Sequence, residues 1–219
     1  MSGVRFASPS AQIDVLPGGD VVVLATHEQV LGGPDGQVYT GCRFPADPAY
    51  AAVVARYAEA TGRVLAARGV LGRVSVDFAA AQDAAGAWAV RALEINLRKG
   101  GTTHPYSVLR NVAPGRYDVD TGCWRTEDGT SRCYSATDNL VDPAWTGLPP
   151  REAIRAVTSS DLGFDPARGT GVVLHMLSGL SIDGRIGLTA IGHDPEEAEQ
   201  LHAATQDALG MAAAEFSST

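Results

Sequence analysis

The sequence predicts an α+β protein, in which helices flank an antiparallel sheet and a smaller α+β part follows. Runs rich in β-branched residues are separated by short turns, so consecutive strands can pair as hairpins. Other segments repeat apolar residues at helical spacing behind a proline. The chain has 219 residues, 45% of them apolar, and can therefore form a substantial core.

The first sheet-forming part is expected in residues 20–112. Its expected strands and one helix are, in order, 20–31, 38–44, 47–69 (the helix), 70–80 and 88–97. Asp47 and Pro48 are typical of a helix start, and Gly69 is placed to end that helix. Residues 1–19 contain prolines and a glycine pair, so we expect a loose N-terminal segment.

The second part is expected in residues 113–219, after a break at APGRYD. Residues 112–147 show no periodicity and are expected to be irregular. A proline-started helix follows at 149–157, and residues 169–192 indicate a hairpin turning at Asp183-Gly184. The last helix begins at Asp194, which can cap it.

Composition argues against several functional classes. The net charge of −8 disfavours nucleic acid as a partner. No run of eighteen apolar residues is present, so no membrane span is expected. The three cysteines are widely spaced, which is typical of a reducing cytoplasm and of free thiols. We therefore expect a cytoplasmic protein.

The stretch LEINLRKGGTTHP, residues 93–105, places polar side chains on one face of a strand. If the strands 70–80 and 88–97 pair around a turn centred between residues 85 and 86, Asp77 lies opposite Glu94. Asn96 then shares their face, and opposed Cβ atoms lie roughly 4.5–5.5 Å apart. The apolar residues of both strands fall on the other face, which we expect to be core.

Two adjacent carboxylates repel each other unless a cation lies between them. Carboxylate and amide oxygens suit Mg²⁺, so Asp77, Glu94 and Asn96 are candidate metal ligands. Arg98 offers a planar fork to phosphate. The alternative is an ordinary solvated strand face, since half-exposed strands alternate polar and apolar residues anyway.

The loop after this strand adds groups that suit an anion. Gly100 and Gly101 allow backbone N–H groups to approach it closely, and Thr102 and Thr103 add hydroxyls. His104 can assist proton transfer from an amine or simply support the loop.

Five further side chains are weaker candidates. Arg73 shares the face of Ser75 and can reach phosphate. His27, Glu28 and Gln29 can face a ligand pocket or the surface. His175 lies in an apolar strand and is expected to be a packed core histidine.

The string SVDF followed by LEINLRKGG resembles the C-terminal half of the ATP-grasp fold. The longer string EINLRKGGTTHPY, with HEQVLGG before it and TGVVLHML after it, is similar to carboxylate–amine ligases related to the pheganomycin peptide ligase. That resemblance covers roughly residues 15–210 and implies a C-terminal subdomain of the ATP-grasp domain followed by a family-specific C-terminal domain.

The resemblance implies ATP and Mg²⁺ as cofactors, with Asp77, Glu94 and Asn96 as metal ligands. Arg98, Gly100, Gly101 and Thr102 would contact the nucleotide phosphates or an acyl phosphate, and Arg98, Arg73 and His104 would assist catalysis. The implied reaction activates a small-molecule or peptide carboxylate as an acyl phosphate, which an amine then attacks to form an amide.

The family's ATP-binding N-terminal half, with its phosphate-gripping lysines and glycine-rich lid, is not visible. Lys99 is the only lysine and lies elsewhere. We therefore expect the missing half in cis or in trans, and we expect the chain alone to be inactive. Two alternatives remain: a non-catalytic remnant that acts as a binding module, and a stand-alone Mg²⁺-dependent enzyme that handles phosphate.

Overall fold

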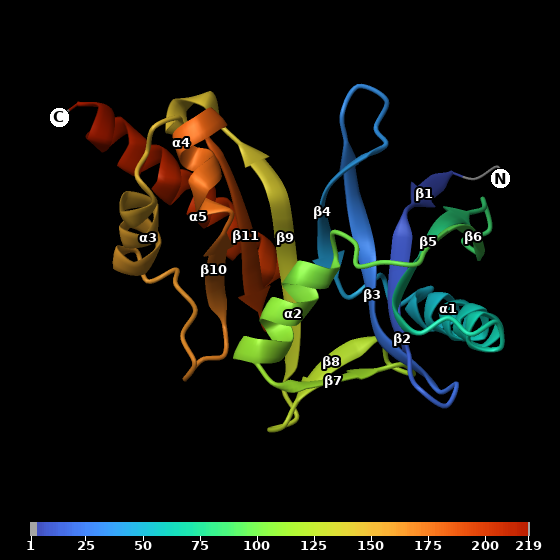
Figure 1. Cartoon of the computed structure of the whole chain (residues 1–219). Coiled ribbons are helices and arrows are strands. Elements are labelled where there is room, and N and C mark those ends of the chain that lie inside the picture. The colour runs from blue at the N-terminus through green and yellow to red at the C-terminus, as the bar shows by residue number, and fades with distance from the viewer. Residues whose placement is uncertain (1–3, 219) are drawn as a thin grey trace.

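Eleven strands form one sheet in the computed structural model, which describes residues 4–218 (Figure 1). The strands are β1 (Arg5–Ala7), β2 (Pro9–Val15), β3 (Val21–Gly32), β4 (Val38–Phe44), β5 (Gly72–Gln82), β6 (Trp88–Asn96), β7 (Gly115–Asp118), β8 (Cys123–Thr126), β9 (Ser131–Val141), β10 (Gly171–His175) and β11 (Arg185–Gly192). The helices are α1 (Ala51–Ala66), α2 (Thr103–Val112), α3 (Pro150–Ser159), α4 (Leu180–Asp183) and α5 (Pro195–Ser217). The predicted antiparallel sheet with flanking helices is confirmed.

The main path through the sheet runs β1-β5-β2-β3-β4-β9-β11-β10, with every pair antiparallel. β1 and β2 follow one another along β5, while β6 also pairs with β5. β7 and β8 extend from β9 as a short ribbon. The sheet therefore ends at β6, the strand that carries two of the three candidate metal ligands.

The expectation of a loose segment at residues 1–19 is wrong for residues 5–15. These form β1 and β2, and β2 lies between β3 and β5. Ala11 and Ile13 are fully buried. Pro9 is tolerated because it is the first residue of its strand, where a missing N–H costs no ladder bond. Residues 1–3 lie outside the described part.

The expectation of irregular structure at 112–147 is also wrong, because β9 occupies 131–141 and joins β4 to β11. Six consecutive residues of β9, from Arg132 to Thr137, are buried. A strand buried on both faces shows no polar–apolar alternation. The Arg, Ser and Thr residues of β9 make the strand still harder to recognise from sequence.

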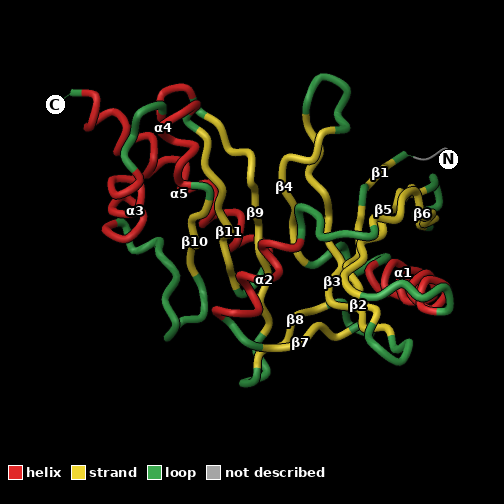
Figure 2. The backbone as a smooth tube through the Cα atoms, in the orientation of Figure 1, coloured by secondary structure: helices red, strands yellow, loops and turns green. Residues whose placement is uncertain are grey.

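The sheet crosses the predicted boundary near residue 113 without interruption (Figure 2). Cys42 of β4 pairs with Ala136 of β9. Gly41 permits this approach, since a Cβ there would lie 2.4 Å from the carbonyl oxygen of Ala136. The division into 20–112 and 113–219 stays a prediction, but both parts share one sheet.

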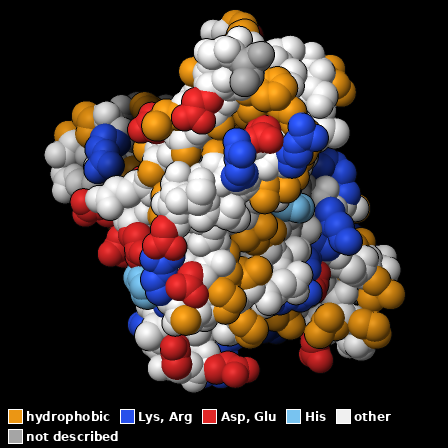
Figure 3. All heavy atoms as spheres, turned by 90° about the vertical axis from the view of Figure 1, so that its left-hand side faces the viewer, with side chains coloured by type: hydrophobic (Ala, Val, Ile, Leu, Met, Phe, Trp, Pro, Cys, Tyr) orange, Lys and Arg blue, Asp and Glu red, His pale blue; other side chains and the backbone are white. Residues whose placement is uncertain are grey.

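Helices cover the two ends of the sheet separately. α1 packs on β2, β3 and β5 through Val54, Ala55 and Ala58, all fully buried. α5 packs on β9 and β11, and α3 packs on α5. Acidic, basic and apolar side chains share the face presented by this end of the molecule (Figure 3). No helix within residues 4–218 is both long and apolar enough to cross a membrane.

The predicted hairpin at 169–192 is correct in its strand pairing and wrong in its turn. β10 and β11 pair antiparallel. A 3-10 turn at Leu177–Gly179 and the short helix α4 connect them instead of a two-residue turn. Gly184, at φ 71°, ends α4 in the left-handed conformation that glycine adopts readily.

Candidate functional site

The predicted pairing of β5 with β6 is confirmed at the candidate metal site. Asp77 is the partner of Glu94, and Ser75 is the partner of Asn96. A β-bulge between Asp77 and Phe78 shifts the remaining register by one residue. The turn is therefore centred at residue 85, one half-step before the predicted position, although the pairing at the site is the predicted one.

Asp77 lies at the centre of a hydrogen-bonded cluster. Asn96 Nδ2 donates to Asp77 Oδ2 at 3.0 Å. Gln29 Nε2, from β3, donates to Asp77 Oδ1 at 3.1 Å. Gln29 thus faces the candidate site, which was one of its two predicted positions. Glu94 is exposed, and its carboxylate makes no hydrogen bond or ion pair within residues 4–218.

The electrostatics of the cluster follow from this crowding. Burial raises the pKa of the Asp77 carboxyl above its ordinary value, and the charge of Glu94 raises that pKa further. The Gln29 hydrogen bond, the Arg98 charge and the Asn96 hydrogen bond lower it by smaller amounts. A cation between the two carboxylates would relieve the repulsion that Glu94 exerts.

The donor set fits a hard divalent cation. Two opposed carboxylates supply anionic oxygens, and the Asn96 amide can present its oxygen after a half-turn of its side chain. Within residues 4–218 no three His, Cys, Asp or Glu side chains gather in a way that could hold a metal. A metal here would therefore depend on the amide and on ligands from outside the carboxylate pair.

A cavity of about 310 Å³ opens over this cluster. Its lining residues come from β3, β4, β5, β6, β9 and the loop after β6: Gln29, Tyr39, Ser75, Asp77, Asn96, Arg98, Gly100, Gly101, Thr102 and Asp138. The fold thus brings Asp77, Asn96, Arg98, Gly100, Gly101 and Thr102 to one cavity. Sequence reasoning missed two lining residues, Tyr39 and Asp138, and Asp138 lies on β9 in the segment expected to be irregular.

Gly100 and Gly101 have structural roles in addition to the predicted contact with an anion. The Gly100 N–H donates to Thr103 Oγ1 at 3.1 Å. A Cβ at Gly101 would lie 2.5 Å from Cε1 of Tyr39, so the tyrosine ring packs directly against this backbone. Arg98 is exposed, and within residues 4–218 its guanidinium donates one hydrogen bond, from Nη1 to the Lys99 carbonyl at 3.3 Å. Its guanidinium is therefore available to a ligand.

Gln12, fully buried on β2, holds this loop in place. Gln12 Nε2 donates to the Thr102 carbonyl at 2.8 Å, and Thr103 Oγ1 donates to Gln12 Oε1 at 2.9 Å. Arg73 also donates to Gln12 Oε1 and pairs with Asp14 at 2.6 Å. Arg73 thus supports the loop through Gln12 while its charge is neutralised. Sequence reasoning missed Gln12 because it lay in the segment expected to be loose.

The remaining candidates separate. His104 lies in the first turn of α2 and contacts His175, with ring centroids 4.2 Å apart. His27 is fully buried and its Nε2 lies 2.6 Å from Tyr134 Oη. Glu28 accepts from Tyr50 Oη, and burial raises its pKa. His27 and Glu28 therefore have structural roles through these hydrogen bonds, whereas His104 lines a cavity next to the site.

Comparison with known proteins places this geometry in context. The chain is 36% identical over 203 residues to an L-propargylglycine–L-glutamate ligase from Streptantibioticus cattleyicolor, a pheganomycin-type peptide ligase; the match covers 92% of this chain and 40% of the ligase. Residues 152–205 match the PGM1 C-terminal domain. The predicted resemblance to pheganomycin-type ATP-grasp ligases is confirmed.

Solved structures show the ATP-grasp fold independently. The phosphoribosylaminoimidazole carboxylase ATPase subunit from Aquifex aeolicus aligns with a TM-score of 0.57 at 14% identity, over 94% of this chain and 57% of that one. A carboxyaminoimidazole ribonucleotide synthase from Aspergillus clavatus, complexed with ATP, aligns with a TM-score of 0.54 at 14% identity, over 93% and 50%. The chain thus spans about two fifths to three fifths of these ATP-grasp relatives.

Proposed function

We propose that this chain is the distal part of an ATP- and Mg²⁺-dependent carboxylate–amine ligase of peptide type. The observation that carries the proposal is the convergence of Asp77, Asn96, Arg98 and the 100–102 loop on one cavity, opposite Glu94. The ligase similarity over 92% of the chain supports it. The complete enzyme would lie in the cytoplasm, as the free thiols suggest.

Each group at the cavity has a role in this proposal. Asp77, Glu94 and Asn96 would hold Mg²⁺, which supplies charge neutralisation at the transferring phosphoryl group. Arg98 and the backbone of Gly100, Gly101 and Thr102 would bind phosphate oxygens. Arg73 acts as a positioning residue through Gln12, which holds the loop.

The proposed reaction has two steps. A substrate carboxylate oxygen attacks the γ-phosphorus of ATP, the bond to ADP breaks, and an acyl phosphate forms. An amine nitrogen then attacks the acyl carbon, loses a proton, and expels phosphate to leave an amide. Both steps depend on positioning and on stabilisation of charge that develops on phosphate, which Arg98 can provide.

An exposed apolar row supports the proposal that an ATP-binding half completes the enzyme, in cis or in trans. Leu93, Ile95 and Leu97 are 68%, 47% and 58% exposed, so the expectation that this face of β6 is core is wrong for the described chain. The opposing Val76 is fully buried under α1, which barely reaches β6. We propose that the missing half covers this row.

The test is a chimera that joins this chain to the part of the Streptantibioticus cattleyicolor ligase that it does not cover. We expect phosphate release from ATP that requires both L-propargylglycine and L-glutamate. Asp77→Asn should lower kcat/KM by about a hundredfold or more, since it removes a charge that the transition state needs. Asp35→Asn, an exposed change of the same charge, is the control.

Calorimetry with Mg·ATP on the chimera separates binding from turnover. Asp77→Ala and Asn96→Ala should each weaken Mg·ATP binding relative to Asp35→Asn. If the chimera binds Mg·ATP and neither substitution changes the Kd, the metal assignment is wrong. If the chimera folds and never binds Mg·ATP, the alternative of a non-catalytic binding module is favoured.

A further inference from the structure

A second cavity of about 280 Å³ lies beside the candidate metal site. It is lined by residues from β4, the loop before α2, α2, β9, the end of β10 and the residue after it: Tyr39, Gly101, His104, Pro105, Ala136, Thr137, Asp138, His175 and Met176. Tyr39, Gly101 and Asp138 also line the first cavity. A ligand in the second cavity would therefore contact residues that also line the first cavity.

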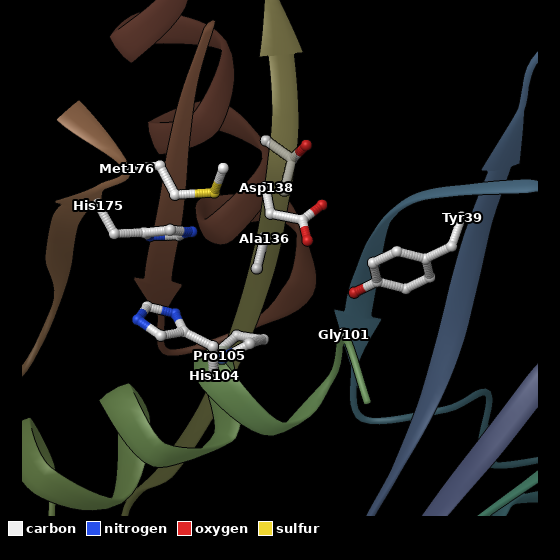
Figure 4. A pocket seen from close by; sticks show the side chains of 9 residues that line it. Tyr39, Gly101, His104, Pro105, Ala136, Asp138, His175 and Met176 are labelled. Carbon is white, nitrogen blue, oxygen red and sulfur yellow. The ribbon is translucent and has the colours of Figure 1, made fainter. Parts of the chain in front are cut away.

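The walls of this cavity are built by close packing across glycines. Tyr39 reaches in from β4 against Gly101 on one side (Figure 4). On the other side the rings of His104 and His175 lie against each other. A Cβ at Gly187 of β11 would lie 2.2 Å from His175 Nε2, so only a glycine at this position leaves room for the imidazole ring. His175 is therefore a cavity-lining residue, and its expected position as a packed core histidine is wrong.

Asp138 gives the cavity a negative charge. It projects from β9, and within residues 4–218 its carboxylate has no hydrogen bond and no ion pair. Burial, together with a smaller contribution from the charge of His104, lowers the pKa of His175 to about 4, so His175 is neutral at pH 7. The half-buried carboxylate thus lacks a counter-charge from His175, and a cation is the complementary ligand.

Two more features mark the cavity as a ligand site. His175 Nδ1 is buried without a hydrogen-bond partner, which is uncommon for a polar atom in a folded protein. Met176, at the rim, has φ 54°, a left-handed conformation that is strained for a non-glycine residue. Such strain persists where the surrounding structure imposes it, and it clusters at binding sites.

We propose that this cavity is the subsite for the amine substrate, with Asp138 pairing with the ammonium group of an amino acid or of a peptide N-terminus. The inference rests on the proposed function, since a carboxylate–amine ligase must hold its amine substrate next to the phosphate site. The volume is at the lower end for small-molecule pockets, which fits one amino-acid residue.

The experiment titrates the full chain with L-alaninamide, a cation without a carboxylate, and with N-acetyl-L-alanine, an anion without an amine. Chemical-shift changes in ¹⁵N-labelled protein report both binding and its location. We expect L-alaninamide to bind and to shift the amides of Gly101, Asp138 and Met176. Asp138→Asn should weaken this binding at least tenfold, whereas Asp35→Asn should leave it unchanged.

Any of three outcomes overturns the proposal: no binding of L-alaninamide to the folded chain, equal binding by Asp138→Asn, or preferential binding of N-acetyl-L-alanine. His175→Gln provides a second variant in case Asp138→Asn fails to fold, and it should also weaken binding. The titration needs neither ATP nor the missing half. An inactive chimera with intact L-alaninamide binding would therefore reject the proposed function and retain the cationic subsite.

Discussion

At the scale of single residues, burial decides which polar groups are structural and which are available. Gln12 and His27 are fully buried and bonded to neighbours, so they hold the framework. Arg98 and Asp138 line cavities and Glu94 lies on the edge strand β6; in the described part of the chain, none of the three forms an ion pair. Groups of the second kind are the ones that a ligand can recruit without first breaking an existing pair.

His27 makes stability depend on pH. Burial lowers its pKa to about 3, while in the unfolded chain it titrates near 6.5. Between these values the unfolded state binds the extra proton, so stability is present above pH 6.5 and is lost as the pH falls. We expect the free energy of unfolding in urea to decline below pH 6.5, with His27 contributing at most about 1.4 kcal/mol per pH unit.

Two variants isolate that contribution. His27→Gln should reduce the slope of unfolding free energy against pH by about one proton, leaving a residual slope from His175 and His202, whose pKa values burial also lowers. Tyr134→Phe removes the hydrogen bond to His27 and should cost about 1 kcal/mol while preserving the slope, because burial is the cause. An unchanged slope in His27→Gln would show that this histidine does not titrate as described.

At the scale of elements, α1 approaches the sheet closely because it carries a glycine on its buried face. A Cβ at Gly62 would lie 2.6 Å from Val21 Cγ1 and 2.7 Å from Ile13 Cδ1. In α5, by contrast, a Cβ at Gly210 would meet nothing within 4 Å. The two helices thus contain the same helix-disfavouring residue for different reasons.

This contrast predicts opposite effects of one substitution. Gly210→Ala should raise the free energy of unfolding by about 1 kcal/mol, the difference in helix propensity. Gly62→Ala gains the same helix propensity, but overpacking against Val21 and Ile13 costs about 1–3 kcal/mol. We therefore expect Gly62→Ala to lower the free energy of unfolding. Urea denaturation of both variants measures the difference. A Gly62→Ala variant as stable as Gly210→Ala would contradict the close helix–sheet contact.

At the scale of the whole molecule, one sheet links the two predicted parts but ends at an apolar edge. β4 and β9 pair across the predicted boundary, so both parts contribute to one ladder. At the other end, Leu93 and Ile95 of β6 are exposed, and so is Leu97 directly after the strand. An exposed, apolar edge strand can pair or pack with another chain. Natural proteins usually prevent this by covering the strand.

If the ATP-binding half covers this row, polar substitutions there should matter only in the completed enzyme. Leu93→Ser with Ile95→Thr should change the stability of the isolated chain by less than about 0.5 kcal/mol, because both side chains are exposed. In the chimera the same pair should lower the Tm and the ligase activity. Ile182→Thr, 77% exposed on α4, should affect neither protein. Equal melting of the substituted and parent chimeras would place the missing half elsewhere.

The sequence by itself determined the elements whose signals are local. The alternation in β5 and β6 was sufficient to predict that Asp77 faces Glu94, and Asp194 caps α5 by accepting the Glu197 N–H at 2.9 Å. Periodicity and capping act between residues close in the chain, so they remain legible without coordinates. The β5–β6 pairing at the site is the predicted one because the bulge between the turn and Asp77 offsets the half-step shift of the turn centre.

Only the tertiary structure decided what depends on distant segments. β2 and β9 are inserted between other strands and buried on both faces, so neither shows the alternation that marks a half-exposed strand. These two strands carry Gln12, which holds the 100–103 loop, and Asp138, which lines both cavities. The exposure of β6 was equally unpredictable, because an apolar strand face has the same pattern whether or not a partner covers it.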